Sequence, residues 1–410
     1  MFEELIRLSR RFLKIKNSPY RRYLIRTTDF DHRMTIIVGQ RGVGKTTTLV
    51  QHLLDCVNGD LLDPRILYLQ VDHFQMGLAS MYEIAEQFCL HGGQWIAFDE
   101  IHKYPDWSKE LKSIYDTFPE LNILASGSSA LEIYRGSHDL TRRAVKYQMQ
   151  GLSFREYLEL THQIDFPWYS LEDICGSHEK ITTKIIDRLE GIHKKVLLEF
   201  KHYLKSGYYP YFSELKNEAN YLLTLEQNLH TTIESDLSSI HPQLSGNSLA
   251  KIKQLLIFVA NSVPFIPNWN KIRLALDIGD LRTLKSYFQH LEDACLIRSV
   301  SRGTKKLSQI ESPSKVYMDN PNQLFAIASE QPEKGTIRET YFLNTLSQNH
   351  HIRLPKNGDF CVDDLYYFEV GGRKKTFHQV KTENNAFLAC DDLEFGVGNK
   401  IPLWLFGFLY

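Results

Sequence analysis

The sequence predicts an α/β fold with a parallel sheet between residues 35 and 150. The main observation is a series of short, continuous apolar runs: "TIIV" (35–38), "ILYLQV" (66–71), "WIAF" (95–98) and "NILAS" (122–126). Such runs are typical of strands that are buried on both faces of a parallel sheet. The segments between them are long enough for crossover helices. With 410 residues, the chain is too long for one core, so we expect further domains to follow.

Composition narrows the class of protein. Hydrophobic residues at 43%, charged residues at 24% and a net charge of −1 describe an ordinary globular protein, so any basic surface must be local. Six scattered cysteines without a CxxC pair argue against a zinc site and for a reducing compartment. The most apolar stretch, "IPLWLFGFLY" (401–410), is too short to span a bilayer. We therefore expect a cytoplasmic protein without a membrane partner, and we interpret this stretch as a buried strand.

The first strand leads into the glycine-rich run "GQRGVGKT" (39–46), which matches G-x4-G-K-[ST] in full and precedes a helical pattern. In this context the backbone N–H groups of the loop surround the phosphates of a nucleotide. Lys45 reaches the terminal phosphates, and the Thr46 hydroxyl is a ligand of Mg²⁺. The residues expected to contact ATP are Gly39, Gln40, Arg41, Gly42, Val43, Gly44, Lys45, Thr46 and Thr47.

The third strand ends in two acids, Asp99 and Glu100. An acid at the carboxyl end of a strand beside the loop can hold Mg²⁺ through water, and the next acid can orient the attacking water. We assign Asp99 to the metal and Glu100 to general-base catalysis; an acidic turn is the alternative. Ser126 ends the next strand and could bind the γ-phosphate or the lytic water, although serines are frequent at strand ends.

Two adjacent arginines, Arg142 and Arg143, follow in "DLTRRA" (139–144). An arginine delivered to a γ-phosphate, from the same chain or from a neighbouring subunit, accelerates phosphoryl transfer. Both residues are therefore candidates for this catalytic role, with delivery in trans requiring a homo-oligomer. A solvated pair of charges is the alternative.

At this point the chain resembles the bacterial and archaeal AAA-type ATP-binding proteins, in which a P-loop core precedes a poorly characterised C-terminal region. The resemblance rests on "GQRGVGKTTTL", "FDEIHKYPDWSKELKSIYD", "ASGSSALEI" and "DLTRRAVKYQMQGLSFREYLEL", and continues through "SGYYP", "ESDL" and "YFQHLEDACLIRSV". It implies an ATPase whose ATP–Mg²⁺ site comprises Gly44, Lys45, Thr46, Asp99 and Glu100. Arg143 occupies the position where many relatives have the arginine of a Gly-Arg pair. Because Arg142 replaces the glycine here, both arginines stay candidates.

Residues 264–300 read as helix, tight turn and helix, with Asn268 as a cap and "DIGD" as the turn. This pattern predicts a winged-helix module that could contact DNA phosphates. The cations offered are Arg282, Lys285 and His290 as exposed positions on the second helix, and Arg298, Arg302, Lys305 and Lys306 in the wing. The second helix lacks a base-reading cluster, so we favour packing or docking of a protein partner over DNA contact.

The last hundred residues invite comparison with restriction-endonuclease-like folds, the fold that the resemblance implies here. Such sites need an Asp and then (D/E)-x-K on the next strand. Asp359 and Glu369 fit as the carboxylates, but Gly371 stands at the lysine position. The candidates for the remaining roles are Lys374 or Lys375, Lys381 in a frame with Gln379, and Glu339 from an upstream helix. We favour a degenerate domain that no longer cuts, with an active nuclease as the alternative.

The sequence as a whole predicts four domains: an AAA-type ATPase core (1–152), a helical lid (153–240), a winged helix (241–310) and a nuclease-like α+β domain (311–410). The predicted function is Mg²⁺-dependent ATP hydrolysis that switches a protein partner, which the sequence does not identify. The alternative is a DNA-binding ATPase. The locally basic segment 7–26 is expected to form a docked amphipathic helix, or else to contact nucleic acid.

Overall fold

A computed structural model describes residues 2–127, 140, 142–215, 217–302, 315–376 and 385–410. Its contacts separate the chain into two compact units. Unit 1 comprises Met1–Gly151 and Thr231–Leu244, and unit 2 comprises Leu152–His230 and Ser245–Tyr410. The chain therefore passes between the units at three points, and the predicted lid segment is divided between them at residue 230. Its role as a lid stays a prediction.

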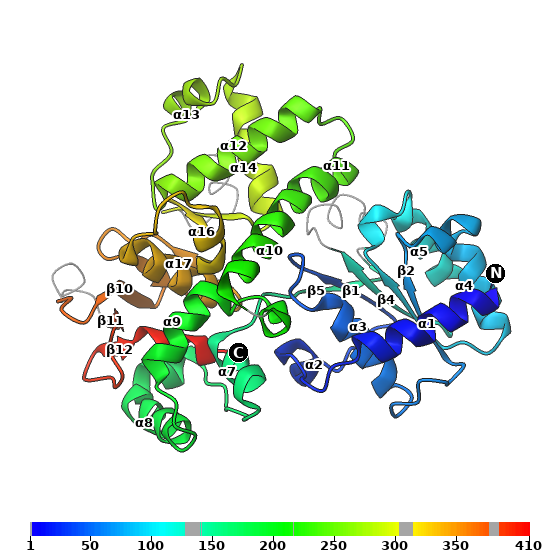
Figure 1. Cartoon of the computed structure of the whole chain (residues 1–410), viewed down its shortest axis with the longest axis horizontal. Coiled ribbons are helices and arrows are strands. Elements are labelled where there is room, and N and C mark those ends of the chain that lie inside the picture. Colours follow the sequence, from blue (N-terminus) through cyan, green and yellow to red (C-terminus); the bar gives the residue numbers. More distant parts are fainter. Residues whose placement is uncertain (1, 128–139, 141, 216, 303–314, 377–384) are drawn as a thin grey trace. The chain divides into compact units, whose positions relative to one another are not determined.

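Unit 1 is built on a five-stranded sheet with the strand order β2-β3-β4-β1-β5, in which every neighbouring pair is parallel (Figure 1). The strands are β1 (Met34–Val38), β2 (Ile66–Gln70), β3 (Trp95–Asp99), β4 (Asn122–Gly127) and β5 (Val145–Gln148). The four strands predicted from apolar runs are confirmed, and the fold is the α/β P-loop type. The apolar runs form strands because both faces of the sheet are covered, which leaves β1 buried at all five positions.

The helices of unit 1 are α1 (Phe2–Lys16), α2 (Tyr23–Thr27), α3 (Lys45–Asp55), α4 (Met81–Leu90), α5 (Trp107–Thr117) and α11 (Leu237–Ile240), with 3₁₀ turns η1 (Phe74–Leu78) and η2 (Ile101–Lys103) and a π-helical turn η5 (Thr232–Asp236). Ile36, Val38 and Phe98 of the sheet join one core with side chains of α1, α4 and α5. Helix α1 is amphipathic, as predicted, and buries Leu5 and Leu13. Ile15, an apolar residue near the end of this helix, is 59% exposed.

The helices of unit 2 are α7 (Phe154–His162), α8 (Leu171–Glu190), α9 (Val196–Ser206), α10 (Glu218–Thr231, whose last residue already belongs to unit 1), α12 (Gly246–Ser262), α13 (Trp269–Ala275), α14 (Leu281–Asp293), α16 (Pro321–Ile327) and α17 (Lys334–Leu346), with 3₁₀ turns η4 (Pro210–Glu214) and η6 (Leu403–Phe408). Within the described parts of the chain, no helix is long and apolar enough to cross a membrane. The Asn268 side chain caps α13 by accepting a hydrogen bond from the Lys271 N–H, as predicted.

Unit 2 contains two sheets. Strands β6 (Ile297–Val300) and β7 (Lys315–Met318) form an antiparallel pair. The larger sheet has the order β12-β11-β10-β9-β8, with strands β8 (Ile352–Arg353), β9 (Phe360–Val362), β10 (Tyr366–Gly372), β11 (Ala386–Asp391) and β12 (Lys400–Pro402). Its β8–β9–β10 part is antiparallel, and its β10–β11–β12 part is parallel. The winged-helix and nuclease-like identities of these regions stay predictions.

The C-terminal apolar stretch is not one strand, so that prediction was wrong. Only Lys400–Pro402 pairs with β11, and Leu403–Phe408 forms the 3₁₀ turn η6. A turn of this kind directs side chains to several sides, and Phe406 contacts Phe342 while Trp404 contacts Phe408. All ten residues from 401 to 410 are buried. A continuous apolar run cannot distinguish a buried strand from a buried helical turn, which explains the error.

Candidate active site

Three adjacent strands bring the predicted site residues together in unit 1. Strand β4 lies between β1 and β3, and all three run in the same direction. The glycine-rich loop after β1, Asp99 at the end of β3 and Ser126 near the end of β4 therefore lie at the same edge of the sheet. The carboxyl ends of strands in open α/β sheets are where ligands bind.

Two glycines give the loop its shape. A side chain at Gly39 would place its Cβ 2.3 Å from the Met149 carbonyl oxygen, so only glycine fits. Gly44 has φ 104°, a left-handed conformation that glycine adopts without strain, and it stands directly before α3. No side chain caps α3 at Gly44. The first N–H groups of this 11-residue helix are therefore suited to an anion.

Lys45 is buried beneath the loop. Its Nζ donates hydrogen bonds to the carbonyl oxygens of Gly39 (3.0 Å) and Gln40 (2.9 Å). Burial lowers the pKa of Lys45, while the nearby carboxylates of Glu100, Asp99 and Asp236 act in the opposite direction. The ammonium group thus lies in a poorly hydrated place where an additional anion, such as a phosphate, would stabilise its charge.

Asp99 receives three hydroxyl groups. The Thr46 Oγ1 and the Tyr68 hydroxyl each donate to Asp99 Oδ2 over 2.6 Å, and the Ser126 hydroxyl donates to Oδ1. Tyr68 was not predicted from sequence, since a tyrosine inside an apolar strand reads as core. A threonine hydroxyl and a neighbouring carboxylate offer the oxygen ligands that Mg²⁺ prefers, so the residues present fit this ion. Three hydroxyls cannot neutralise the charge of Asp99, which leaves it available to a cation.

Glu100 has the properties expected of a functional acid. Its backbone is left-handed, with φ 59°, a conformation that costs free energy for a residue with a side chain. Its N–H donates to the Ser126 hydroxyl over 3.2 Å. Among the described residues, its buried Oε2 has no hydrogen-bond partner, and His102 Nε2 lies 3.6 Å from it. A buried carboxylate oxygen of this kind can accept a hydrogen bond from water or substrate.

Asp236 joins this site from a distant part of the sequence. Its carboxylate accepts a hydrogen bond from Arg41 Nη2 over 2.9 Å and lies 3.7 Å from His102 Nε2. The side chains of Asp236 and His102 are 1% and 0% exposed. Reasoning from the residues missed both; their only signals were two of the segments that carry the resemblance, "ESDL" (234–237) for Asp236 and "FDEIHKYPDWSKELKSIYD" (98–116) for His102.

Arg22 is a further residue that was missed. Its buried guanidinium donates to the carbonyl oxygens of Val43 (2.6 Å), Gln150 (3.0 Å) and Gly151 (2.8 Å). Val43 belongs to the glycine-rich loop, so this arginine fixes the loop from behind. In the sequence, Arg22 looked like one more charge in a basic segment. The alternative that the basic segment contacts nucleic acid is wrong for Arg22, because this residue is only 4% exposed.

The two candidate arginines lie in different surroundings. Arg142 is exposed. Arg143 pairs with Asp116 of α5, with Nε and Nη2 each 2.8 Å from a carboxylate oxygen. The pairing holds Arg143 on α5, and a role at the γ-phosphate would require the ion pair to open. Their catalytic assignment stays a prediction.

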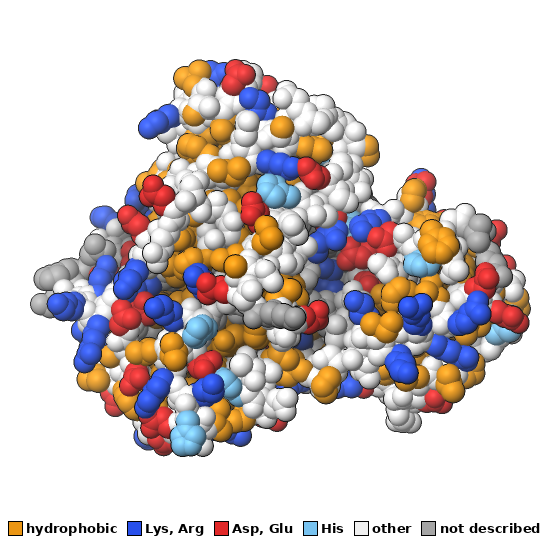
Figure 2. Space-filling view, viewed as in Figure 1, with side chains coloured by type: hydrophobic (Ala, Val, Ile, Leu, Met, Phe, Trp, Pro, Cys, Tyr) orange, Lys and Arg blue, Asp and Glu red, His pale blue; other side chains and the backbone are white. Residues whose placement is uncertain are grey.

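The cations of the helix–turn–helix are only partly available. Arg282, Lys285 and Arg302 are exposed, and the Lys285 ammonium lies 5.7 Å from the centre of the Trp269 ring. His290 is buried at 6% exposure, so its prediction as an exposed position was wrong: it lies on the inner face of α14. Arg298 forms a 2.6 Å ion pair with Asp319 instead of facing outward. Lys305 and Lys306 lie outside the described residues. On the drawn face of unit 2, basic and acidic side chains are interspersed (Figure 2).

In unit 2, the predicted nuclease-like carboxylates Glu339, Asp359 and Glu369 lie beside lysines or hydrogen-bond donors of the chain itself. Glu339 Oε2 accepts hydrogen bonds from Lys315 (2.7 Å) and Tyr317 (2.8 Å). Asp359 Oδ2 accepts the Val370 N–H over 2.8 Å, and the buried Glu369 lies 3.6 Å from Lys375 Nζ.

Lys375 lies over Gly371, where the motif lysine was expected. A Cβ built at Gly371 would come within 2.9 Å of Lys375 Cδ. Lys374 is exposed, and Gln379 and Lys381 lie outside the described residues. No group of three His, Cys, Asp or Glu side chains that could hold a metal occurs within the described ranges. The geometry of the described residues therefore does not support a metal site in this sheet.

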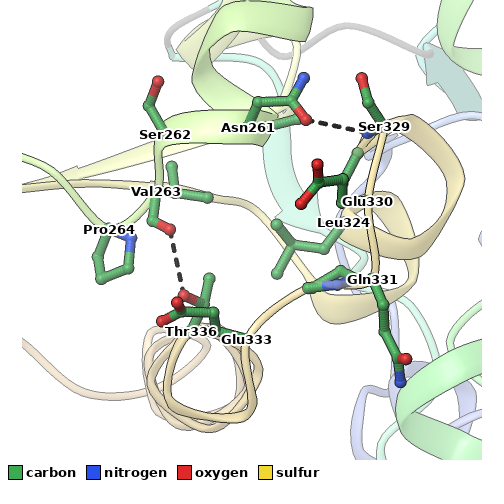
Figure 3. Close-up of a pocket in the computed structure, with 13 residues that line it drawn as sticks. Asn261, Ser262, Val263, Pro264, Leu324, Ser329, Glu330, Gln331, Glu333 and Thr336 are labelled. Carbon is green, nitrogen blue, oxygen red and sulfur yellow. Dashed lines mark hydrogen bonds between the residues drawn. The ribbon is translucent and has the colours of Figure 1, made fainter.

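Unit 2 also contains a cavity of about 570 Å³ between the ends of α12 and α16 and the start of α17 (Figure 3). Its walls are tied by hydrogen bonds from Thr336 Oγ1 to the Val263 carbonyl and from the Ser329 N–H to Asn261. Glu330 and Glu333 are its acidic lining residues. The cavity has no lining lysine, arginine, histidine or cysteine, and so offers no nucleophile–base pair.

Comparisons with known proteins agree with the fold of the first unit. Residues 31–158 match the model of the AAA domain, and residues 197–327 match that of a domain of unknown function (DUF8612). An uncharacterised protein of Methanocaldococcus jannaschii is 28% identical over 240 residues, which are 56% of this chain and 48% of that protein. The chain thus matches about half of the length of this relative.

Solved structures with similar arrangements share little sequence with this chain. PCH-2 of C. elegans is 13% identical with a TM-score of 0.24, the match covering 70% of this chain and 68% of PCH-2. AMPPCP-bound DnaA of Aquifex aeolicus is 16% identical with a TM-score of 0.28, covering 70% and 88%. RIF2 of Saccharomyces cerevisiae is 12% identical with a TM-score of 0.29, covering 58% and 94%. Scores this low carry no argument beyond the AAA match itself.

Proposed function

We propose that this protein hydrolyses ATP with Mg²⁺ at the site in unit 1. The observation that carries the proposal is the pairing of Thr46 with Asp99, 2.6 Å apart, next to a Glu100 oxygen that is buried without a hydrogen-bond partner among the described residues. Asp99, which can bind a cation, and Glu100, which can accept a proton, therefore lie together at the end of β3. The glycine-rich loop and Lys45 complete a phosphate site beside them.

Each residue has a distinct part in the proposed mechanism. The N–H groups at the start of α3 and Lys45 bind the phosphates, and Lys45 exchanges its two carbonyl contacts for phosphate oxygens. Bound Mg²⁺, held by Thr46 and Asp99, would neutralise phosphate charge. Glu100 orients the attacking water and accepts its proton. Ser126 supports both acids, because its hydroxyl donates to Asp99 and accepts the Glu100 N–H.

The proposed use of this activity is a nucleotide-dependent switch that acts on a protein partner. Two observations support a switch: the chain passes between the units three times, and one of the returning segments contacts the site through Asp236. The six free cysteines agree with a reducing, cytoplasmic setting. A homo-oligomer would be required if Arg142 or Arg143 acted on a neighbouring subunit.

Steady-state phosphate release from ATP tests this proposal. We expect turnover that requires Mg²⁺ and is lost in Glu100→Gln, while Glu86→Gln, which removes an exposed acid on α4, behaves as wild type. Adding duplex or single-stranded DNA should leave the rate unchanged. Strong stimulation by DNA that disappears in the Arg282→Ala/Lys285→Ala variant would favour the DNA-binding ATPase instead. Absence of Glu100-dependent turnover would remove the ATPase proposal.

A second candidate function is hydrolysis of nucleic-acid phosphodiesters by the C-terminal sheet. The observation in its favour is Lys375, which lies over Gly371 and 3.6 Å from Glu369, where the motif lysine was expected. Incubation of plasmid and single-stranded DNA with the protein and Mg²⁺ or Mn²⁺ tests this idea. Cleavage that is lost in both Glu369→Gln and Lys375→Ala would establish it; we expect no cleavage, since the carboxylates are engaged by neighbouring groups.

A further inference from the structure

The segment Thr231–Leu244 has an unusual place in the chain, because it belongs to unit 1 while the residues on both sides of it belong to unit 2. The backbone is helical from Glu218 to Ile240, through α10, η5 and α11, so the boundary at residue 230 falls inside helical backbone. η5 is a π-helical turn, a rare conformation that occurs often at functional sites. It ends at Asp236.

Asp236 connects two parts of the proposed site. Its buried carboxylate binds Arg41 of the glycine-rich loop at 2.9 Å and lies 3.7 Å from His102 Nε2. The same His102 nitrogen lies 3.6 Å from Glu100 Oε2. His102 is held in the 3₁₀ turn that follows Glu100, and its side chain is fully buried. One carboxylate therefore positions both the phosphate-binding loop and, through His102, the general base.

The charges of the site indicate how a bound nucleotide would change the contact between Asp236 and the loop. Asp99, Glu100 and Asp236 face Arg41 and Lys45, so acids outnumber these cations even before a nucleotide binds. A γ-phosphate entering the loop adds negative charge and competes with Asp236 for Arg41. The attraction that holds Asp236 against the loop is then weakened. The position of η5 should accordingly depend on the terminal phosphate of the nucleotide.

There is space within unit 1 for α11 and the residues after it to move. A cavity of about 550 Å³ separates the residues after Glu100 from the returning segment; its walls include His102, Tyr104 and Trp107 on one side and Ser239, Ile240 and Pro242 on the other. Close-packed interiors resist displacement, whereas a segment bordering an open cavity can shift without overlap.

From these contacts we propose that Asp236 and His102 are positioning residues of the ATP site, and that the Asp236–Arg41 pair reports the γ-phosphate to the segment Thr231–Leu244. The inference rests on the proposed ATP hydrolysis. It goes further by naming the residues through which the nucleotide state reaches the two chain connections at residues 230 and 245. Neither residue touches the reacting atoms; both act through Glu100 and Arg41.

Kinetics of Asp236→Asn test the positioning role. We expect kcat to fall about 10- to 100-fold while KM for ATP changes less than about threefold. In a Glu100→Gln background, the same substitution should lower the residual kcat by a smaller factor than in the wild type, because the part of its effect that acts through Glu100 is already lost. The matched control is Glu234→Gln, which removes an exposed carboxylate from the same turn and should behave as wild type. Wild-type kcat in Asp236→Asn would overturn the proposal.

Hydrogen exchange of Thr231–Leu244 tests the reporting role independently of turnover. In the wild type, a non-hydrolysable ATP analogue with Mg²⁺ should change exchange in this segment, ADP should not, and Asp236→Asn should abolish the difference. Equal exchange with the analogue and with ADP in the wild type would overturn the proposal, even if ATP is hydrolysed. If Asp236→Asn does not fold, His102→Gln interrupts the same link; wild-type kcat and exchange in that variant would also overturn it.

The two proposals fail in distinguishable ways. A wild-type protein without Glu100-dependent turnover would contradict the proposed ATPase, while the exchange difference between analogue and ADP would still decide whether the γ-phosphate is sensed. A protein that hydrolyses ATP normally but shows no effect of Asp236→Asn would leave the ATPase intact and remove only the inference.

Discussion

The proposed ATP site of unit 1 and the large sheet of unit 2 both gather carboxylates near strands, but the cations beside these carboxylates differ in number. In unit 1, three hydroxyl groups donate to Asp99, and the carboxylates of Asp99, Glu100 and Asp236 outnumber the neighbouring cations Lys45 and Arg41. In unit 2, Glu339 and Glu369 lie next to lysines of the chain itself. An excess of carboxylates over cations attracts a further cation, whereas one lysine for each carboxylate reduces the need for one. Similar motifs can therefore mark an active centre in one domain and internal ion pairs in another.

The largest effect should follow from removing the phosphate-binding cation. Lys45→Ala removes the buried ammonium beneath the loop, and we expect kcat/KM for ATP to fall at least about 100-fold. Phosphate release and nucleotide binding by calorimetry measure this loss. Lys109→Ala, which removes an exposed lysine paired with Asp106, is the control. Wild-type ATP binding by Lys45→Ala would mean that the loop is not the phosphate site.

Arg22 tests whether the loop must be held from behind. Replacing it with alanine removes three hydrogen bonds to buried carbonyl groups, including that of Val43. We expect the free energy of unfolding to fall by about 2–4 kcal/mol, measured by urea titration, with weaker ATP binding. Its neighbour Arg21, an exposed partner of Asp55, is the matched control and should cost less than about 1 kcal/mol. Equal effects of both substitutions would contradict this role.

In unit 2 the corresponding test separates ion pairing from catalysis. Glu369→Gln leaves Lys375 without its 3.6 Å carboxylate contact, and we expect the free energy of unfolding to fall by about 1–3 kcal/mol with ATP turnover unchanged. The Glu369→Gln/Lys375→Met double variant should recover part of this stability. If instead ATP turnover falls with Glu369→Gln, the carboxylates of unit 2 contribute to ATP hydrolysis and are not merely ion-pair partners.

The smallest effect is expected at Asp359. Burial raises the pKa of its carboxyl group above the usual 3.8, opposed by the hydrogen bond from the Val370 N–H. A raised pKa in the folded state means that stability falls as the pH rises from about 3.8 through the folded pKa. Asp359→Asn keeps an acceptor for Val370 and removes this titration, so it should be neutral or stabilising by less than about 1 kcal/mol. Thermal unfolding between pH 3.5 and 7 measures the difference, and a loss of stability at pH 7 would contradict it.

Local patterns predicted which residues meet at the edge of the sheet in unit 1, because these residues follow its strands; their roles in nucleotide binding stay predictions. The run from Gly39 to Thr46 and the pair Asp99–Glu100 each stand at the end of an apolar run, and parallel strands bring such ends together. Asp236, His102 and Arg22 escaped this reasoning. Asp236 and Arg22 reach the site through long-range contacts, for which spacing in the sequence gives no signal, and His102 follows Glu100 closely but has no motif that shows its burial.

In unit 2, sequence patterns predicted helices and strands better than they predicted which groups surround a given side chain. The helix cap at Asn268 and the strand holding Glu369 were found, but Arg298 turned out to pair with Asp319, and His290 to face inward. A charged residue on a predicted helix does not reveal its partner when that partner lies in another element. Likewise, the apolar C-terminal stretch could not show that it turns after Pro402 instead of continuing as a strand.

A single-turnover experiment on Glu100→Gln is the most direct test that Glu100 is the general base for ATP hydrolysis in unit 1. Radiolabelled ATP and Mg²⁺ are mixed with excess protein, and bound ATP and released phosphate are followed in the same sample. We predict that Glu100→Gln binds ATP as the wild type does but releases phosphate at least about 100-fold more slowly, because the general base is gone. Phosphate release at the wild-type rate by Glu100→Gln would contradict the assignment of the active site.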